Sequence, residues 1–323
     1  MSKKVVITDC DHDSMEPEYE VAAANGVELV ESPSASLDDI VAAAKDADAI
    51  VVQYVKITAD LMDRLPNLKA IGRYGVGVDT IDVPAATQRG IAVCSVPDYG
   101  TEAVSDHAIG LALAVARGIP RLDRGVRAGS ADFVPIKPLY GFAGRTFGVL
   151  GLGLIGSATA RKALGLGYEV IAHDTALEPG TEKDGITIVS FEELLERSDI
   201  LSLHVPLTEE NHHVIGAAEL AKLGPLTIVV NTSRGGVMDT EALVDALDRG
   251  AIYGAGLDVH EQEPLPAEHA LTRFDNVVLT PHTAWYTEES YFDLKRRVVE
   301  NVARVVNGQQ PRNILNPEVL PAG

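Results

Sequence analysis

A glycine-rich turn near the middle of the chain places the strongest constraint on the fold. Gly151-Leu-Gly153-Leu-Ile-Gly156 follows the apolar segment 147–150 and precedes a segment with helical spacing of its apolar residues. In such a strand–turn–helix unit, the first glycine permits a tight turn and the second lets the backbone approach a ligand. The third lets helix and strand pack closely. The pattern therefore predicts a parallel α/β sheet that binds a dinucleotide at this turn.

The phosphates of such a dinucleotide are expected at the N-terminus of the helix. There the backbone N–H groups have no partner within the helix and the helix dipole is positive, so both favour an anion. The residues expected to line this end of the nucleotide are Gly151, Gly153, Leu154, Ile155 and Gly156.

An acidic residue indicates which nucleotide is bound. Asp174 ends the next predicted strand, close to the spacing of about 20 residues that dinucleotide-binding units use. Its carboxylate would accept hydrogen bonds from the ribose hydroxyls and would repel a 2′-phosphate. No Lys or Arg follows in Thr175-Ala176-Leu177. We therefore expect NAD rather than NADP as the cofactor.

Strand and helix patterns alternate in two series along the chain, which predicts two parallel sheets covered by helices. A long helix, Glu102–Arg117, separates the series, and the proline and glycine content of Gly118–Gly144 predicts an arm and a linker. A second long helix, Glu288–Asn307, follows the last strand. The predicted strands are Val5–Thr8, Val27–Glu31, Ala49–Gln53, Leu68–Gly72, Ile91–Val96, Phe147–Leu150, Glu169–His173, Ile186–Val189, Ile200–His204, Ile228–Asn231, Gly254–Asp258 and Val277–Thr280.

The fold expected from this order is α/β, with two doubly wound parallel-sheet domains and a cleft between them. Residues 1–100 and 289–323 would form a flavodoxin-like substrate domain, and residues 101–288 a Rossmann NAD-binding domain. A chain of 323 residues has ample length for two such domains. Because the chain would cross between them twice, we expect two hinges and a closure that excludes water from the substrate.

The charge of the chain argues against two classes of partner. Its formal net charge is −20, so a nucleic-acid backbone or an anionic lipid surface would repel it. The longest apolar stretch, Ala108–Ile119, is too short to span a bilayer, and the first residues predict a strand rather than a signal peptide. The two cysteines, Cys10 and Cys94, form no disulfide framework. We expect a cytoplasmic protein without nucleic-acid or membrane partners.

Three polar segments each follow a predicted strand of the second series. They are Asn231-Thr-Ser-Arg234-Gly-Gly, Asp258-Val-His-Glu-Gln-Glu263-Pro and Thr280-Pro-His282-Thr-Ala-Trp285. Open α/β sheets build their sites at the carboxyl ends of strands, so we expect these segments to meet there. An arginine, a carboxylate and a histidine are the groups that reduction of a 2-oxo acid requires.

These segments resemble the D-isomer-specific 2-hydroxyacid dehydrogenase family, and the resemblance extends along essentially the whole chain. The motifs N-T-S-R-G-G, D-V-H-E-Q-E-P and T-P-H at these spacings are highly specific. Within the family, D-V-H-E-Q-E-P and P-H-T-A-W-Y look like the C-terminal-binding-protein branch and its bacterial relatives. Most other members have Phe at the position of His260, and many have Gly near Trp285.

The resemblance implies a role for each of the three central residues. His282 would protonate the carbonyl oxygen as hydride arrives and accept the proton in reverse. Glu263 would hydrogen-bond the imidazole and favour its cationic form, because a nearby negative charge stabilises the imidazolium. Arg234 would bind and polarise the carbonyl and help to hold the substrate carboxylate.

The resemblance also implies further contacts with substrate and cofactor. Arg73, Gly75, Val76 and Gly77 match a loop that binds the substrate carboxylate, and Trp285 is either a wall of the substrate pocket or part of the core. The helix after Thr101 and the arm match the dimer-forming region, so a homodimer is expected. No metal ligand is expected. The other positions that match cofactor contacts are His204, Val205, Pro206, Thr232, Arg234, Asp258 and His282.

Other interpretations compete with this one. Each polar residue alone has a structural explanation, and His107 and His212–His213 are expected on a helix or loop surface. Two other functions fit the same residues, namely an NAD(H)-sensing co-repressor-like interaction protein and a dehydrogenase of another small anion such as phosphite. Glu263 argues against formate, since that branch has Gln at this position. The complete Arg–Glu–His set favours the 2-hydroxyacid enzyme, whose substrate the sequence does not specify.

Overall fold

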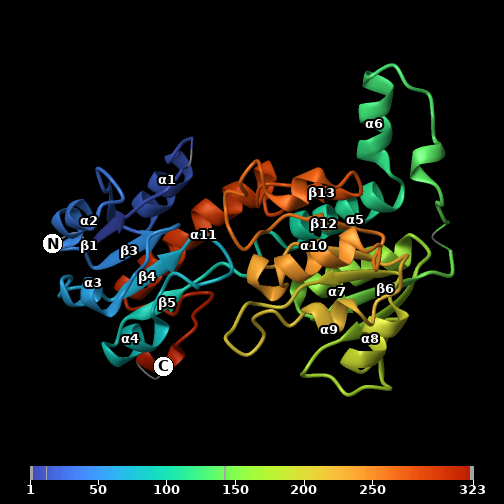
Figure 1. Ribbon diagram of the computed structural model, residues 1–323. Coiled ribbons are helices and arrows are strands. Elements are labelled where there is room, and N and C mark those ends of the chain that lie inside the picture. Colours follow the sequence, from blue (N-terminus) through green and yellow to red (C-terminus); the bar gives the residue numbers. More distant parts are fainter. Residues whose placement is uncertain (1–2, 12, 142, 321–323) are drawn as a thin grey trace. The chain divides into compact units, whose positions relative to one another are not determined.

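The structure, a computed structural model, describes residues 3–11, 13–141 and 143–320. It divides into two compact units (Figure 1). The first unit comprises Met1–Gly100 and Thr287–Gly323, and the second comprises Thr101–Tyr286. The chain returns to the first unit after Tyr286, slightly before the expected boundary at residue 288.

The first unit is built on a five-stranded sheet in which every strand pairs in parallel. The strand order is β2-β1-β3-β4-β5, which is the flavodoxin-like order, and it reverses direction between β1 and β3. Its strands are β1 (Lys3–Ile7), β2 (Val27–Glu31), β3 (Ala49–Val52), β4 (Ala70–Arg73) and β5 (Ala92–Cys94).

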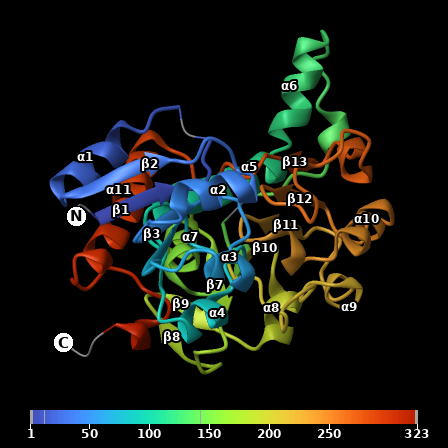
Figure 2. The ribbon, with the colours of Figure 1, turned by 90° about the vertical axis from the view of Figure 1, so that its left-hand side faces the viewer.

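Helices cover both faces of this sheet. A Cβ at Gly72 of β4 would lie 2.8 Å from Val302 Cγ1, so the glycine lets the long closing helix pack directly on the strand. On the other face, Ile40, Leu61 and Ile71 belong to one buried apolar cluster. Figure 2 shows α1 and α11 side by side. The helices are α1 (Glu16–Ala24), α2 (Leu37–Ala44), α3 (Ala59–Asp63), α4 (Val83–Gln88) and α11 (Glu288–Val306), with a 3-10 turn η4 (Pro317–Val319).

The second unit is built on an eight-stranded sheet of order β13-β12-β11-β10-β6-β7-β9-β8. All pairs are parallel except β8 with β9. The order reverses between β6 and β10, the switch point at which such sheets bind dinucleotides. The strands are β6 (Thr146–Leu150), β7 (Glu169–His173), β8 (Glu182–Lys183), β9 (Ile186–Ile188), β10 (Ile200–Leu203), β11 (Ile228–Asn231), β12 (Gly254–Leu257) and β13 (Val277–Leu279).

The helix that opens the second unit is buried against its sheet, as its apolar spacing predicts. A Cβ at Gly256 of β12 would lie 2.8 Å from Leu111 Cβ, so helix and strand pack without an intervening side chain. Among the described residues, none of the helices has both the length and the apolar character that a membrane span requires. The helices are α5 (Thr101–Ala116), α6 (Ile119–Arg127), α7 (Leu154–Gly165), α8 (Phe191–Arg197), α9 (Ala217–Leu220) and α10 (Thr240–Asp248), with 3-10 turns η1 (Val134–Ile136), η2 (Gly235–Val237) and η3 (Ala270–Arg273).

The proline- and glycine-rich segment 118–144 is more ordered than an arm and a linker. It contains α6, which extends away from the rest of the second unit in Figure 1, and the turn η1. Pro120 lies in the first turn of α6, where a missing N–H costs nothing, so the proline starts the helix rather than breaking it. None of the residues of α6 is buried.

Candidate active site

The glycine turn lies at the carboxyl end of β6, beside β10. Gly151 has φ of +90°, and a Cβ there would lie 2.8 Å from Val205 Cγ1 and 2.9 Å from the His204 carbonyl oxygen. Only a residue without a side chain fits this turn at low cost. The first glycine therefore brings the ends of the two switch-point strands together.

The other two glycines fit the roles expected of them at a pyrophosphate. A Cβ at Gly156 would overlap the carbonyl oxygen of Gly151, so this glycine permits close packing of α7 on the turn. A Cβ at Gly153, by contrast, would meet no described atom within 4 Å. Gly153 is also the N-cap of α7 and supplies no side-chain cap, which leaves the first N–H groups of the helix for an anion.

Asp174 follows β7 and is bonded to the glycine turn. One carboxylate oxygen accepts the Leu152 N–H at 2.8 Å, and the other accepts the Ala176 N–H at 2.9 Å. Each carboxylate oxygen has two acceptor sites, so both retain capacity for a ribose hydroxyl. The same side chain thus orders the turn and presents a negative charge beside it.

Residues beyond β10 and β11 complete this edge of the sheet. His204 Nε2 lies 2.8 Å from Ser202 Oγ, and burial lowers the pKa of His204 to about 4, so its ring is neutral. The hydroxyl of Thr232 is buried and has no hydrogen-bond partner among the described residues. A buried hydroxyl without a hydrogen-bond partner in the protein is expected to bond to a ligand or a water. These features fit a bound dinucleotide.

His282 and Glu263 form a hydrogen-bonded pair. His282 Nδ1 lies 2.8 Å from Glu263 Oε2, and the two side chains are 40% and 38% exposed. Burial raises the pKa of Glu263. Hydrogen bonds from His282 and from the His260 N–H lower it by more, so the pKa lies below its usual value. Because an ionised carboxylate only accepts hydrogen bonds, Nδ1 of His282 carries the proton and Nε2 is left for another partner.

The loop that carries His282 is held by Asp258, which is fully buried. One carboxylate oxygen accepts the Thr280 hydroxyl at 2.6 Å and the Thr283 N–H at 3.0 Å, and the other accepts the Ala284 N–H at 2.9 Å. The Asp258 carbonyl accepts the His282 N–H at 2.7 Å. These bonds stabilise the left-handed backbone of His282, whose φ is +56°. A contact of Asp258 with the cofactor stays a prediction.

Sequence patterns did not reveal two residues of this network. Thr280 Oγ1 lies between Asp258 and His107, and His107 Nε2 lies 2.9 Å from that hydroxyl. His107, on α5, is 26% exposed and not a free surface side chain as expected. The sequence offered one signal that His107 is partly buried, namely its position in the helix beside the buried Ala108.

Arg234 follows β11 in an extended conformation that the neighbouring Asn231 supports. The Asn231 side chain donates to the Arg234 carbonyl at 2.9 Å and accepts the Ser233 N–H at 3.0 Å. A Cβ at Gly235 would overlap the backbone of His260. The glycine therefore lets the Arg234 segment pack against the segment that leads to Glu263.

Trp285 contacts the same loop rather than a separate part of the core. Its Nε1 donates to the His282 carbonyl at 3.0 Å, and its ring packs edge-on against Tyr286 with centroids 5.7 Å apart. The indole thus helps to fix the backbone at His282. That Trp285 lines the substrate pocket stays a prediction.

The expected carboxylate-binding loop lies in the first unit, at the carboxyl end of β4. Gly75 has φ of +131°, and a Cβ there would overlap the guanidinium of Arg73, so the arginine folds over the glycine. The Gly75 carbonyl accepts the Val96 N–H at 2.9 Å. Val76 is 42% exposed and Gly77 follows it. The loop is therefore an ordered turn in which Gly75 is buried and Val76 is exposed.

Comparison with known proteins shows which family the chain resembles. A profile described as D-isomer specific 2-hydroxyacid dehydrogenase, NAD binding domain, matches residues 109–284. The chain is 43% identical to the glyoxylate reductase of Korarchaeum cryptofilum (strain OPF8) over 286 residues, which are 87% of this chain and 86% of that protein.

Two solved structures have the same fold along nearly their whole length. An NADPH-dependent glyoxylate/hydroxypyruvate reductase from Sinorhizobium meliloti, in complex with NADP and malonate, superposes with a TM-score of 0.87 at 32% identity. It covers 100% of this chain and 99% of its own. A D-lactate dehydrogenase from Aquifex aeolicus, complexed with NAD and lactic acid, gives a TM-score of 0.85 at 29% identity over 99% and 100% of the two chains.

The fold and the family profile identify an NAD-dependent oxidoreductase. The chain belongs to the D-isomer specific 2-hydroxyacid dehydrogenase family. The family resemblance and the two α/β domains predicted from the sequence are thereby confirmed. The reaction is hydride transfer between NAD(H) and a 2-hydroxy acid with its 2-oxo acid.

Proposed function

We propose that His282 is the acid–base residue of this reaction, with Glu263 as its partner and Arg234 as the substrate-binding cation. The observation that carries the proposal is the 2.8 Å contact between His282 Nδ1 and Glu263 Oε2. It leaves Nε2 of a half-exposed imidazole to exchange a proton with a substrate. The pair lies at the carboxyl edge of the sheet that also carries the glycine turn.

The cofactor, when bound, supplies or removes the hydride. In reduction, His282 Nε2 donates its proton to the carbonyl oxygen, which becomes the hydroxyl of the product. The ionised Glu263 stabilises the imidazolium before transfer, and solvent reprotonates the exposed ring afterwards. Arg234 binds the substrate carboxylate and polarises the carbonyl, because its planar donors match both oxygen groups. Asp258 holds the loop, so His282 keeps its orientation throughout.

The substrate class proposed is a small 2-oxo acid and its D-2-hydroxy acid. Relatives named glyoxylate reductase, glyoxylate/hydroxypyruvate reductase and D-lactate dehydrogenase support this size of substrate. Arg73 and the backbone N–H groups of Val76 and Gly77 would bind the carboxylate. We retain the C-terminal-binding-protein-like branch as the proposed subgroup on the strength of His260 and Trp285.

We also propose that the protein is a homodimer. Large apolar side chains gather on α6 and the segment that follows it, where Ile119, Val126, Phe133 and Val134 are 54%, 68%, 58% and 59% exposed. Apolar surface of this kind is typical of an interface. A monomer in light scattering would contradict this proposal. The cytoplasmic location remains a prediction from the two cysteines.

The experiment that tests the proposed site is NADH oxidation against a panel of 2-oxo acids. We expect turnover with at least one small 2-oxo acid and a D-configured product. His282→Gln should lower kcat by about 10²- to 10⁴-fold, the usual contribution of a positioned acid, while NADH fluorescence titration remains unchanged. The matched control His269→Asn replaces a histidine outside the site and retains an acceptor for the Leu271 N–H, so its kcat should remain unchanged. Near-wild-type turnover of His282→Gln would refute the assignment.

A further inference from the structure

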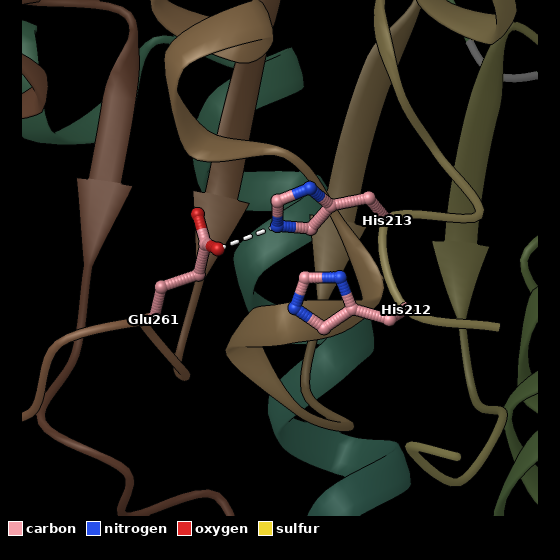
Figure 3. Close-up of side chains that lie close together, drawn as sticks. All are labelled: His212, His213 and Glu261. Atoms are coloured by element: carbon pink, nitrogen blue, oxygen red, sulfur yellow. Dashed lines mark hydrogen bonds and ion pairs between the residues drawn. The ribbon is translucent and has the colours of Figure 1, made fainter. Parts of the chain in front are cut away.

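Two histidines and a glutamate outside the proposed active site lie together in the second unit. Figure 3 shows the Glu261 carboxylate pointing at the His213 ring, with the His212 ring beside it. His213 Nε2 lies 2.6 Å from Glu261 Oε1. One nitrogen of each histidine and one oxygen of the glutamate lie within 4.8 Å of one another. The three side chains come from two segments that are far apart in the sequence.

A second layer of contacts orients these side chains. The other oxygen of Glu261 accepts the Thr240 N–H at 2.9 Å, so the carboxylate is fixed in direction. His213 Nδ1 lies 3.9 Å from the Asp239 carboxylate, on the side of the ring away from Glu261. Histidines that bind metals usually donate from their second nitrogen to a carboxylate, and at 3.9 Å the Asp239 carboxylate is close enough for an ion pair but not for this hydrogen bond. The His213 N–H is itself bonded to the Gly236 carbonyl at 2.8 Å.

Charge and geometry favour a cation between these groups. Burial raises the pKa of Glu261, but hydrogen bonds from Thr240 and His213 lower it below its usual value, so the carboxylate is ionised. Zinc–nitrogen and zinc–oxygen bonds are about 2.0–2.2 Å long, so two ligand atoms of a tetrahedral ion lie roughly 3.3–3.6 Å apart. His213 Nε2 and Glu261 Oε1, now 2.6 Å apart, must therefore separate slightly as the proton leaves, and the wider separations, up to 4.8 Å, must shorten. The two imidazole rings stack with centroids 3.9 Å apart. His212 is exposed, and rotation of its side chain can bring its nitrogen toward the other two groups.

We propose that His212, His213 and Glu261 form a binding site for a zinc-like divalent transition-metal ion. Two imidazole nitrogens and one carboxylate oxygen suit zinc and its neighbours, whereas Mg²⁺ and Ca²⁺ require sites made of oxygen. Three protein ligands leave a fourth position for water. The sequence predicted no metal ligand, because two adjacent histidines and a distant glutamate match no known spacing.

The proposed metal site lies next to the segments that carry Glu263 and Arg234. Glu261 is separated from Glu263 by one residue, and the backbone at Glu261 packs on Gly235, next to Arg234. A bound ion would replace the proton between His213 and Glu261 and tie the two segments together. An ion that binds only the folded chain stabilises it, so the site also predicts a rise in unfolding temperature.

The test is isothermal titration of the full-length, tag-free, chelator-treated protein with ZnCl₂. We expect one saturable site per chain, a higher unfolding temperature with Zn²⁺, and no binding of MgCl₂ at the same concentration. Binding of CoCl₂ should add the visible absorption of a four-coordinate Co²⁺ centre. NADH titration reports that each variant is folded, and none of these measurements depends on catalysis.

Variants separate the proposed ligands from other histidines. His212→Phe retains a stacked ring, and Glu261→Gln retains an acceptor for Thr240. Each should weaken Zn²⁺ binding by more than about 100-fold, since loss of an outer carboxylate alone costs about 10- to 100-fold. Asp239→Asn should weaken Zn²⁺ binding by about tenfold or less, because its carboxylate lies 3.9 Å from His213 Nδ1.

The matched control is His269→Asn, which removes a histidine outside the cluster but retains an acceptor for the Leu271 N–H. This variant should bind Zn²⁺ as the unmodified chain does. No saturable binding by the unmodified chain would overturn the proposal, as would equal affinity of the His212→Phe and Glu261→Gln variants. Equal binding of Mg²⁺ would also overturn it.

Discussion

Asp258→Asn tests whether a buried carboxylate organises the loop that carries His282. The carboxylate oxygens accept three hydrogen bonds, from the hydroxyl of Thr280 and the N–H groups of Thr283 and Ala284. An asparagine has one acceptor oxygen and one donor group in the same space. Whichever way the amide turns, at least one buried N–H then faces a donor.

The magnitude follows from the bonds that are lost. A hydrogen bond to a charged group contributes about 1.5–3 kcal/mol, and a buried donor left without a partner costs about 1–3 kcal/mol. We expect the variant to lose about 3 kcal/mol of stability. For a unit of about 150–250 residues, this corresponds to a fall in unfolding temperature of roughly 6–12 °C. Displacement of His282 by about 1 Å would lower kcat by about 100-fold.

Thermal unfolding and steady-state kinetics of the purified variant measure both effects. The matched control is Asp245→Asn, because Asp245 is an exposed helix residue whose carboxylate pairs with Arg249, four residues later. Its removal should change stability by less than about 0.5 kcal/mol. If Asp258→Asn unfolds within about 2 °C of the unmodified protein and turns over substrate equally fast, the carboxylate does not organise this loop.

Three further changes probe other parts of the site. Arg234→Lys keeps the charge but loses the planar pair of donors, so kcat/KM for the oxo acid should fall about 10- to 100-fold; an unchanged KM would contradict a carboxylate contact. Asp174→Asn removes the negative charge beside the ribose, so the ratio of kcat/KM for NADPH to that for NADH should rise at least about tenfold; a constant ratio would exclude Asp174 from cofactor choice. The pKa of folded His204, about 4, lies below the unfolded value of 6.5, so stability should be complete above the unfolded pKa and decline as the pH falls toward the folded one. Urea unfolding of His204→Gln should show a smaller loss between those pH values, and an equal loss would place the titration elsewhere.

Much of the fold could be predicted because its determinants are local. The segments Glu169–His173 and Ile228–Asn231 are strands at the predicted residues, since short apolar runs between turns specify buried parallel strands. Val27–Glu31 is also a strand as predicted, and its alternating burial fits its place at the edge of the sheet. The helix α6 was not predicted, because proline and glycine suggest irregular structure unless the proline falls in a first helical turn. The two-residue strand β8 was also missed, since it has no apolar pattern.

The site was predictable to the extent that residue type and strand ends determine it. The pairing of His282 with Glu263 joins two segments that each follow a strand, and adjacent parallel strands end at one edge. The contact of His107 with Thr280 joins a helix to a loop 173 residues later. Hydrophobic periodicity carries no information about such a bond, because its polar partners lie outside the apolar pattern. The pair His213–Glu261 was missed for the same reason.

The left-handed backbone at His282 has an evolutionary consequence. Asparagine and glycine adopt this conformation at lower cost than histidine, so mutation at this position tends toward residues that relax the chain. A lineage released from selection for turnover would gain folding free energy as it lost the imidazole. Descendants that lost turnover by losing this imidazole should therefore be the more heat-resistant ones.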